Sequence, residues 1–201
     1  MHIRMTLTDG ATDIDSATTH LRDEVLPKLK GQNGFRGMTA SADRQAGVLA
    51  VVTSWETEAD LKASEAAASQ VRDRAVDAIG GRLVEVRTYE EVVNEVGQTP
   101  PAPGCLLVVT PVRMEPANVA ANVAFFRETV LPEIKALPGF RAVRNMVDRE
   151  TGEAMVGVVL TDEAAVEMWM AGAEQRRRRA SGQGIELGPP ARREVVFAAL
   201  G

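Results

Sequence analysis

Several residue types that carry chemistry in other proteins are scarce in this chain. Its 201 residues include one cysteine, two histidines and one tyrosine, and aromatic residues make up only 4%. The single cysteine, Cys105, excludes an intrachain disulfide and a cysteine zinc site. So few aromatic side chains, together with a formal net charge of −5, leave neither a stacking surface nor a basic face for nucleic acid. We therefore expect no nucleic-acid partner.

Long apolar runs are missing as well. No run approaches the ~18 residues of a transmembrane helix, and the N-terminal residues lack the apolar core of a signal peptide. These absences predict no membrane partner and a cytoplasmic location. The chain also lacks a phosphate-binding loop, a nucleotide-binding glycine fingerprint, a nucleophile elbow, and a His/Asp/Glu cluster at metal-ligand spacing. We therefore expect no metal and no cofactor.

The chain does contain an internal repeat. Aligned at an offset of 105 residues, segment 22–72 matches segment 127–177 without a gap, and 18 of the 51 aligned pairs are identical. Chance would give only a few identities. The sequence therefore predicts two copies of one unit, at residues 1–95 and 105–201, joined by a Pro/Gly linker at 96–104.

The apolar pattern within each copy predicts the order β-α-β-β-α-β. An alternating strand comes first, with Ile3, Met5 and Leu7 on one face. The apolar stripe of a helix follows, formed by Ile14, Thr18, Leu21, Val25 and Leu29, and by Val119, Val123, Phe126, Val130 and Ile134 in the second copy. Pro27 and Pro132 are expected to kink these helices, and Gly34 and Gly139 to end them.

The remaining segments complete a ferredoxin-like unit in each copy. They are the two-sided apolar strands Val48–Trp55 and Glu153–Leu160, helices that begin after Thr57 and after Thr161-Asp162, and the closing strands Leu83–Val92 and Arg193–Leu200. Strands that are apolar on both faces need cover on both sides. The predicted fold class is therefore α+β, with two ferredoxin-like units packed sheet to sheet as one intramolecular α/β barrel. Such a chain covers its own sheets, so we expect a pseudo-dimeric monomer, and any homodimer would use other surfaces.

Two sets of motifs carry a resemblance to a known family. They are Val25-Leu26-Pro27, Gly34-Phe35-Arg36-Gly37 and residues 54–66 in the first copy, and Val130-Leu131-Pro132, Gly139-Phe140 and residues 148–152 in the second. The chain resembles the antibiotic-biosynthesis-monooxygenase-like branch of the dimeric α/β-barrel superfamily over nearly its whole length, twice. The resemblance implies that fold. It also implies a range of activities, because the superfamily includes cofactor-independent monooxygenases, haem-degrading enzymes, isomerases and barrels with no established reaction.

The resemblance permits a test for haem. The haem-degrading relatives resemble one another in a tryptophan early in the second helix, an iron-binding histidine about ten residues later and an asparagine on the first strand. Trp169 falls at the tryptophan position, but Arg178 or Arg179 falls at the histidine position, and neither first strand contains asparagine. Haem iron would have no axial ligand there, so we expect no haem.

Candidate ligand-pocket residues fall in both copies. Arg4 and Thr6 form the only clearly polar face of a first strand, and their counterparts at the offset of 105, Val109 and Pro111, are apolar. If one copy alone retains a pocket, Arg4 and Thr6 mark the first copy, whereas Asn145 and Trp169 mark the second. The sequence leaves both alternatives open.

Further arginine and tryptophan candidates have two interpretations each. Arg22, Arg127 and Arg141, with Arg36, could stabilise an anionic substrate or could form surface ion pairs. Trp55 could line a pocket mouth or plug the end of the barrel, and Trp169 could contact a ligand or pack between helix and sheet. The run 176–179, four arginines, is interpreted as a solvated helix end.

Two functions follow from these observations. The first is a cofactor-independent monooxygenase or isomerase acting on a small acidic aromatic or polyketide-like molecule, for which the protein supplies a dry pocket, a base and anion stabilisation. No base stands out, and neither His2 nor His20 is placed in an evident cleft. The second function is a non-catalytic barrel that binds a small ligand or serves in a stress response. A cavity of roughly a few hundred cubic ångströms with convergent polar groups would support a ligand site.

Overall fold

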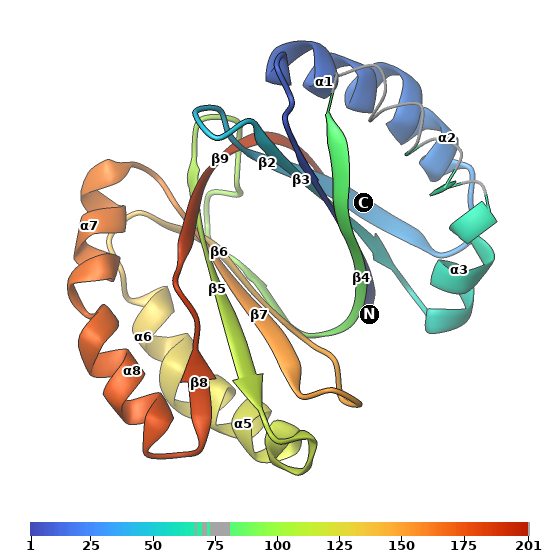
Figure 1. The fold of residues 1–201 in the computed structure, drawn as a ribbon. Helices are drawn as coiled ribbons and strands as arrows, with labels where there is room; N and C mark the ends of the chain where they lie inside the picture. Colours follow the sequence, from blue (N-terminus) through green and yellow to red (C-terminus); the bar gives the residue numbers. More distant parts are fainter. Residues whose placement is uncertain (67, 70–71, 73–80, 201) are drawn as a thin grey trace. The chain divides into compact units, whose positions relative to one another are not determined.

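The structure, a computed structural model, describes residues 1–66, 68–69, 72 and 81–200 (Figure 1). The chain divides into two units, and each is described by itself. Unit 1 comprises Met1–Thr88 and Glu194–Gly201, and unit 2 comprises Tyr89–Arg193.

Unit 1 is built from an antiparallel sheet and helices on one of its faces (Figure 1). Its elements are β1 (His2–Asp9), α1 (Ile14–His20), the π-helical turn η1 (Leu21–Val25), α2 (Leu26–Lys30), β2 (Phe35–Asp43), β3 (Val48–Trp55), α3 (Glu58–Ala63), the start of β4 (Arg82–Val96) and the end of β9 (Ala191–Leu200). The strand order is β4-β1-β3-β2-β9. Its first four strands have the predicted ferredoxin-like order.

Unit 2 repeats this plan. Its elements are the end of β4, β5 (Leu106–Met114), the 3-10 turn η2 (Pro116–Asn118), α5 (Val119–Phe125), the π-helical turn η3 (Phe126–Val130), α6 (Leu131–Lys135), β6 (Phe140–Val147), β7 (Glu153–Leu160), α7 (Glu163–Ala171), α8 (Ala173–Ser181), β8 (Ile185–Leu187) and the start of β9. Strand β7 pairs with both β5 and β6, and β8 pairs with β5. The short strand β8 has no counterpart among the predicted elements.

The closing strands are longer than the apolar pattern predicted. The first was expected at Leu83–Val92, but β4 continues to Val96 because Glu90–Val96 pair with β6. The second begins at Ala191 rather than at Arg193. Strands β4 and β9 each have residues in both units, so the units are not the same division as the predicted repeats. The repeat boundaries and the linker at 96–104 stay a prediction, although residues 97–104 contain no helix or strand.

The repeat is visible in the element boundaries. The helical segments of residues 14–30 and 119–135 share the same division into helix, π turn and helix, 105 residues apart. Strands β3 and β7 also match residue for residue at this offset. The two copies therefore share their local structure as well as their sequence.

The two helix prolines are accommodated by π turns, which the sequence had not indicated. Proline lacks an N–H, so a carbonyl four residues earlier loses its usual partner. In the turn before Pro27, the N–H of Leu26 donates to the carbonyl of Leu21, and Leu131 donates to Phe126 in the same way before Pro132. These bonds span five residues instead of four. The prolines therefore follow a wider turn, and the helical segment continues beyond them.

The helix boundaries combine confirmed and corrected predictions. Thr57 caps α3 by accepting from the N–H of Asp60, as predicted, and Asp162 caps α7 in the same way. The first helical segments end at Lys30 and Lys135, earlier than the glycines expected to end them. Gly34 and Gly139 instead lie in the turns directly before the following strands, with φ of 71° and 78°, a region that favours glycine.

Each unit buries its own apolar side chains between helices and sheet. In unit 1, Trp55 and Met38 pack with α1 and α2, and in unit 2, Ile134 and Val158 are almost fully buried. Within the described residues, no helix has the length and apolarity needed to span a membrane. The fold therefore positions one helix-to-sheet layer per unit in which a site can form.

Candidate functional site

Each unit contains a cavity between its first helical segment and its sheet. The unit 1 cavity has a volume of about 90 Å³, with Arg4, Thr6 and Thr53 on its strand side and His20 on its helix side. The unit 2 cavity has a volume of about 100 Å³. Ligand pockets for drug-sized molecules are several times larger, at roughly 300–1,000 Å³. Both volumes are also below the few hundred cubic ångströms set out above as support for a ligand site, so that criterion is not met and any ligand would have to be small.

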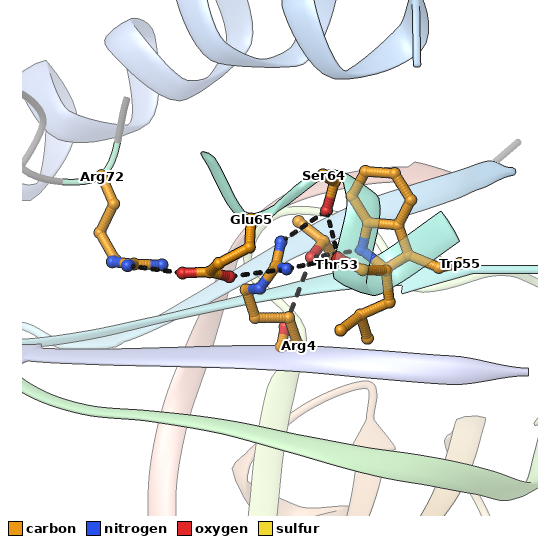
Figure 2. Close-up of polar contacts among 7 residues, drawn as sticks. Arg4, Thr53, Trp55, Ser64, Glu65 and Arg72 are labelled. Carbon is orange, nitrogen blue, oxygen red and sulfur yellow. Dashed lines mark hydrogen bonds and ion pairs between the residues drawn. The ribbon is translucent and has the colours of Figure 1, made fainter. Parts of the chain in front are cut away.

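Arg4 is the most deeply buried charged group of the unit 1 cavity. Only 4% of its side chain is exposed, and it lies on β1 among residues that face the helices. Its Nη1 donates to Ser64 Oγ at 2.9 Å, and its Nη2 donates to the Leu61 carbonyl at 2.7 Å (Figure 2). Nη2 also forms an ion pair with Glu65 Oε2 at 2.7 Å. Burial lowers the pKa of Arg4 below its ordinary value, Glu65 opposes this decrease and Arg72 adds to it.

Arg72 completes a chain of charges along this side of the cavity. Its Nη2 lies 3.1 Å from Glu65 Oε1, so Glu65 bridges the two arginines (Figure 2). Glu65 is 49% exposed, whereas Arg72 is 13% exposed. Among the residues that the structure describes, Arg4 Nε and Arg72 Nε are buried and have no hydrogen-bond partner. Two buried charged donors, on residues that line the cavity, are therefore unsatisfied in the described part of the chain.

His20 corrects the expectation that neither histidine lies in a cleft. It is half-buried at the end of α1 and lines the unit 1 cavity. Ala17, three residues earlier, lines the same cavity, and helix positions i and i+3 share a face. This spacing could have identified His20 from the sequence. The apolar stripe alone did not, because His20 is not one of its members.

The strand pairing corrects the predicted counterparts of Arg4 and Thr6. Arg4 pairs with Thr53 on β3, and the equivalent pair in unit 2 is Val108 with Val158. By the same comparison, the counterpart of Thr6 is Thr110 rather than Pro111. The offset is therefore 104 in the first strands, one residue less than elsewhere. An apolar residue still replaces Arg4, whereas Thr6 and Thr110 are identical and both line a cavity.

The unit 2 cavity has an aromatic lining that includes Phe125, Phe126 and Trp169. Arg176 on α8 stacks on Trp169, with the guanidinium carbon 3.5 Å from the ring centroid. Burial lowers the pKa of Arg176 to about 10, so the group stays charged at neutral pH. This contact corrects the interpretation of the four-arginine run as wholly solvated. Trp169 is 8% exposed and both packs between helix and sheet and lines the cavity.

The other arginine candidates lie outside the cavity linings. Arg22 pairs with Asp23 at 2.7 Å on the exposed surface. Arg127 donates to the Val92 carbonyl at 2.6 Å. Arg141 donates to Thr161 Oγ1 through Nε and Nη2, at 3.1 and 2.7 Å. The contact of Arg22 matches its ion-pair interpretation, whereas the contacts given for Arg127 and Arg141 are hydrogen bonds to a carbonyl and a hydroxyl.

Trp55 and Asn145 are buried away from the cavity linings. Trp55 is 0% exposed, packs edge to face on Phe35 and donates from Nε1 to Thr53 Oγ1 at 3.1 Å. It supports the cavity through Thr53. Asn145 is 1% exposed, and its Oδ1 has no hydrogen-bond partner among the described residues. The structure thus brings Arg4 and Thr6 together in unit 1, and places Trp169 in a second cavity.

Comparison with known proteins gives the class of protein first. A candidate monooxygenase from Fusobacterium nucleatum has a TM-score of 0.70 at 13% identity, covering 99% of this chain and 94% of that chain. An anthrone oxidase-like protein has a TM-score of 0.66 at 17% identity, covering 99% and 93%. A ferredoxin-fold protein from Listeria monocytogenes, related to antibiotic biosynthesis monooxygenases, has a TM-score of 0.53 at 9% identity, covering 97% and 95%. The chain therefore has the ferredoxin-like fold of these proteins, which confirms the predicted α+β class with ferredoxin-like units.

A closer sequence relative then gives the family. No protein-family model matches the chain. Uncharacterized protein Rv2557 of Mycobacterium tuberculosis is 30% identical over 154 residues, which cover 77% of this chain and 68% of the relative. The chain belongs to the same family as this mycobacterial protein.

Proposed function

We propose that this protein is a cofactor-independent oxygenase that acts on a small, acidic, one-ring molecule bound in the unit 1 cavity. The observation that carries the proposal is the convergence of Arg4, Arg72 and His20 on one cavity whose remaining wall is mainly apolar. The proposed enzymatic class follows the structural relatives described as a candidate monooxygenase and as an anthrone oxidase-like protein. In this proposal, the two guanidinium groups with unsatisfied donors would bind the anion and the imidazole would act as the base.

Arg4 and Arg72 would hold the acidic group. Each has a buried Nε donor without a partner in the described part of the chain, and hydrogen bonds from charged donors to anions are stronger than neutral ones. Glu65 already supplies a carboxylate to both arginines, so this position accepts a carboxylate geometrically. Because Glu65 is half exposed, an incoming anion can compete with it.

His20 would act as the general base. Histidine is the side chain that most readily takes up and releases protons near neutral pH. Removal of a proton from an activated carbon of the substrate gives a carbanion, which donates an electron to dioxygen. The two radicals combine into a peroxide anion, which takes back the proton from His20. Where the attacked carbon was a CH₂, the resulting hydroperoxide then loses water and leaves a ketone. One O₂ is consumed and one water is released, so no metal or organic cofactor is required for the electron balance.

The size of the cavity restricts the substrate. A volume of about 90 Å³ is of the same order as the engineered apolar cavity of about 150 Å³ that takes up benzene. This volume favours a single ring over the polyketide-like alternative. The acidic group would lie at Arg4 and Arg72, with the ring against Val25, Leu29 and Val51.

A second candidate function is binding without catalysis. It is favoured by one observation: none of the side chains that line the described cavity is an acid that could pair with His20. Apart from His20 and the two arginines, the polar lining residues are Thr6, Thr8 and Thr53. Such a protein would bind the same anion and leave it unchanged. The two functions therefore share a site and differ only in oxygen consumption.

The test measures binding and oxygen uptake separately. Benzoate serves as a non-reactive binding probe by calorimetry, and 2-hydroxyphenylacetate and related one-ring acids with an activated CH₂ serve as substrates at an oxygen electrode. Benzoate binding with stoichiometric oxygen uptake supports the oxygenase. Benzoate binding without uptake for any acid in the panel supports the non-catalytic function, and absence of benzoate binding contradicts both.

A further inference from the structure

The unit 2 cavity lies at the same place in its unit as the unit 1 cavity. Equivalent lining positions are Thr6 and Thr110, Val25 and Val130, Leu29 and Ile134, Val51 and Val156, Ala68 and Ala173, and Arg72 and Arg177. The backbone therefore shapes two cavities in one chain. What they bind depends on the positions at which their side chains differ.

At the positions that differ, unit 2 lacks the polar and charged side chains that unit 1 has. Phe125 occupies the position of His20, and Trp169 occupies that of Ser64. Val108, the counterpart of Arg4, offers no hydrogen-bond donor from its side chain. With Phe126, the unit 2 cavity gains three aromatic rings where the unit 1 lining has none apart from the imidazole. An aromatic lining favours a flat apolar ligand, through stacked or edge-to-face contacts.

The cations at the unit 2 cavity are largely engaged. Arg176 is stacked on Trp169 and donates to the Trp169 carbonyl. Arg179 forms an ion pair with Glu133 at 2.7 Å, and Glu133 also lines the cavity. Arg177 is exposed, and exposed charges bind anions weakly. An anionic ligand would also meet the negative charge of Glu133.

We propose that the unit 2 cavity is a second binding site, chemically distinct from the first, for a neutral one-ring aromatic molecule of the phenol class. The ring lies against Phe125, Phe126 and Trp169, and its hydroxyl lies toward Thr110 on the strand side. The planar guanidinium of Arg176 adds a cation–π surface at the same cavity. A volume of about 100 Å³ matches one ring. This proposal does not depend on the function proposed for unit 1.

The experiment compares phenol with benzoate on the full chain. The two probes share one ring and differ in charge at neutral pH. The chain has two tryptophans, one in each unit, so the Trp55→Phe variant leaves Trp169 as the only indole reporter. Phenol is expected to bind with a dissociation constant on the order of 1 mM or below, as a ligand of about seven non-hydrogen atoms allows. Its binding should change Trp169 fluorescence, and benzoate should not. Calorimetry on the unaltered chain repeats the measurement without the substitution.

Matched variants assign each probe to a cavity. Ala173→Leu places three additional carbons in the unit 2 cavity, and Ala68→Leu does the same at the equivalent position of unit 1. We expect Ala173→Leu to weaken phenol binding at least about tenfold, the effect of roughly 1.4 kcal/mol, without changing benzoate binding. Ala68→Leu should leave phenol binding unchanged. Thermal unfolding of each variant verifies that the fold is retained.

Three results would overturn the proposal. They are the absence of phenol binding to the unaltered chain, tighter binding of benzoate than phenol at Trp169, and phenol binding that survives Ala173→Leu in a folded variant. None of these results bears on the unit 1 site, which is read out by benzoate and oxygen uptake.

Discussion

The two units share a backbone plan and differ in the side chains at and beside their cavities. At equivalent positions, unit 1 has Arg4, His20, Thr53 and Ser64, whereas unit 2 has Val108, Phe125, Val158 and Trp169. Each substitution replaces a polar or charged side chain by an apolar one. A repeated fold can therefore retain its frame while the chemistry at its centre diverges, because the frame depends on the apolar pattern and the turns, which both copies keep.

The polar network of unit 1 is energetically demanding. Burial of a guanidinium is unfavourable unless hydrogen bonds and an opposite charge compensate for it. Arg4 receives that compensation from Ser64, Leu61 and Glu65, yet its Nε stays unpaired in the described residues. Unit 2 has Val108 at the equivalent position, and its apolar side chain needs no such compensation. The retention of a buried, incompletely satisfied arginine in one unit alone is consistent with a role for it in binding.

The largest expected effect is on catalysis, and it distinguishes the role of His20 from that of His2. His20→Phe gives unit 1 the residue that unit 2 has at the same position. Oxygen uptake should fall by about 10²–10⁴-fold, since a general base contributes on that order. Benzoate affinity should stay near its original value. His2→Phe is the control, because His2 lies outside the cavity lining, and unchanged uptake in His20→Phe would exclude His20 as the base.

The next effect is on anion binding. Arg4→Met removes the buried guanidinium and should weaken benzoate binding by about 10²-fold, within the range for loss of one partner from a buried charged contact. Val108→Met makes the matched change in unit 2 and should have no effect. Arg4→Lys, which retains the charge, should recover part of the affinity. Equal losses from Arg4→Met and Val108→Met, measured by calorimetry, would place the anion elsewhere.

A smaller effect of opposite sign is expected at Glu65. Glu65→Gln removes the carboxylate that competes for Arg4 and Arg72, so benzoate affinity should rise by about threefold to fivefold, as for a partly exposed ion pair. Glu58→Gln breaks another ion pair, with Lys62, and is the control for overall charge. A decrease in affinity would indicate that Glu65 orients the arginines rather than competes with the ligand.

The smallest effect tests whether the units remain equivalent as structures. Thr57→Ala and Asp162→Ala each remove a helix N-cap, and each should lower the free energy of unfolding by about 1 kcal/mol. Chemical denaturation measures both. A loss in one unit alone would show that the frame, and not only the cavity, has diverged.

Assembly remains a prediction of the sequence. The full chain should sediment as a pseudo-dimeric monomer at low concentration, because the two copies were expected to cover each other's apolar strands. A stable, concentration-independent dimer would contradict it. A fragment of residues 1–95 lacks the end of β9, which pairs with β2, so it should associate or aggregate.

Much of the fold followed from local patterns. The strands Val48–Trp55 and Glu153–Leu160 have the predicted boundaries, and Thr57 caps its helix, because apolar runs and capping residues act over a few positions. The π turns before Pro27 and Pro132 were missed. A proline indicates a lost hydrogen bond but not which neighbouring carbonyl adjusts.

The site was predicted only in part. Arg4 and Thr6 stood out because a polar strand face is unusual beside an apolar pattern, and Trp169 stood out as a large aromatic residue. His20, Ser64 and Glu65 did not, since residues of these types are common in helical segments and at their ends and carry no signal of their own. Their significance comes from neighbours distant in sequence, such as the 60 residues between Arg4 and Ser64.

The sequence by itself determined the repeat, the order of elements and the family resemblance, since these depend on periodicity and on identities counted along the chain. Tertiary structure decided where the closing strands end, because a strand continues only while a partner strand pairs with it, as β6 pairs with Glu90–Val96. It also decided that, in the described part of the chain, each unit has a cavity between helices and sheet, and that His20 joins Arg4 in the unit 1 cavity. Cavity lining depends on which side chains converge across helix and sheet. The strand pairing, and not a constant offset of 105, shows which residues of the two first strands are equivalent.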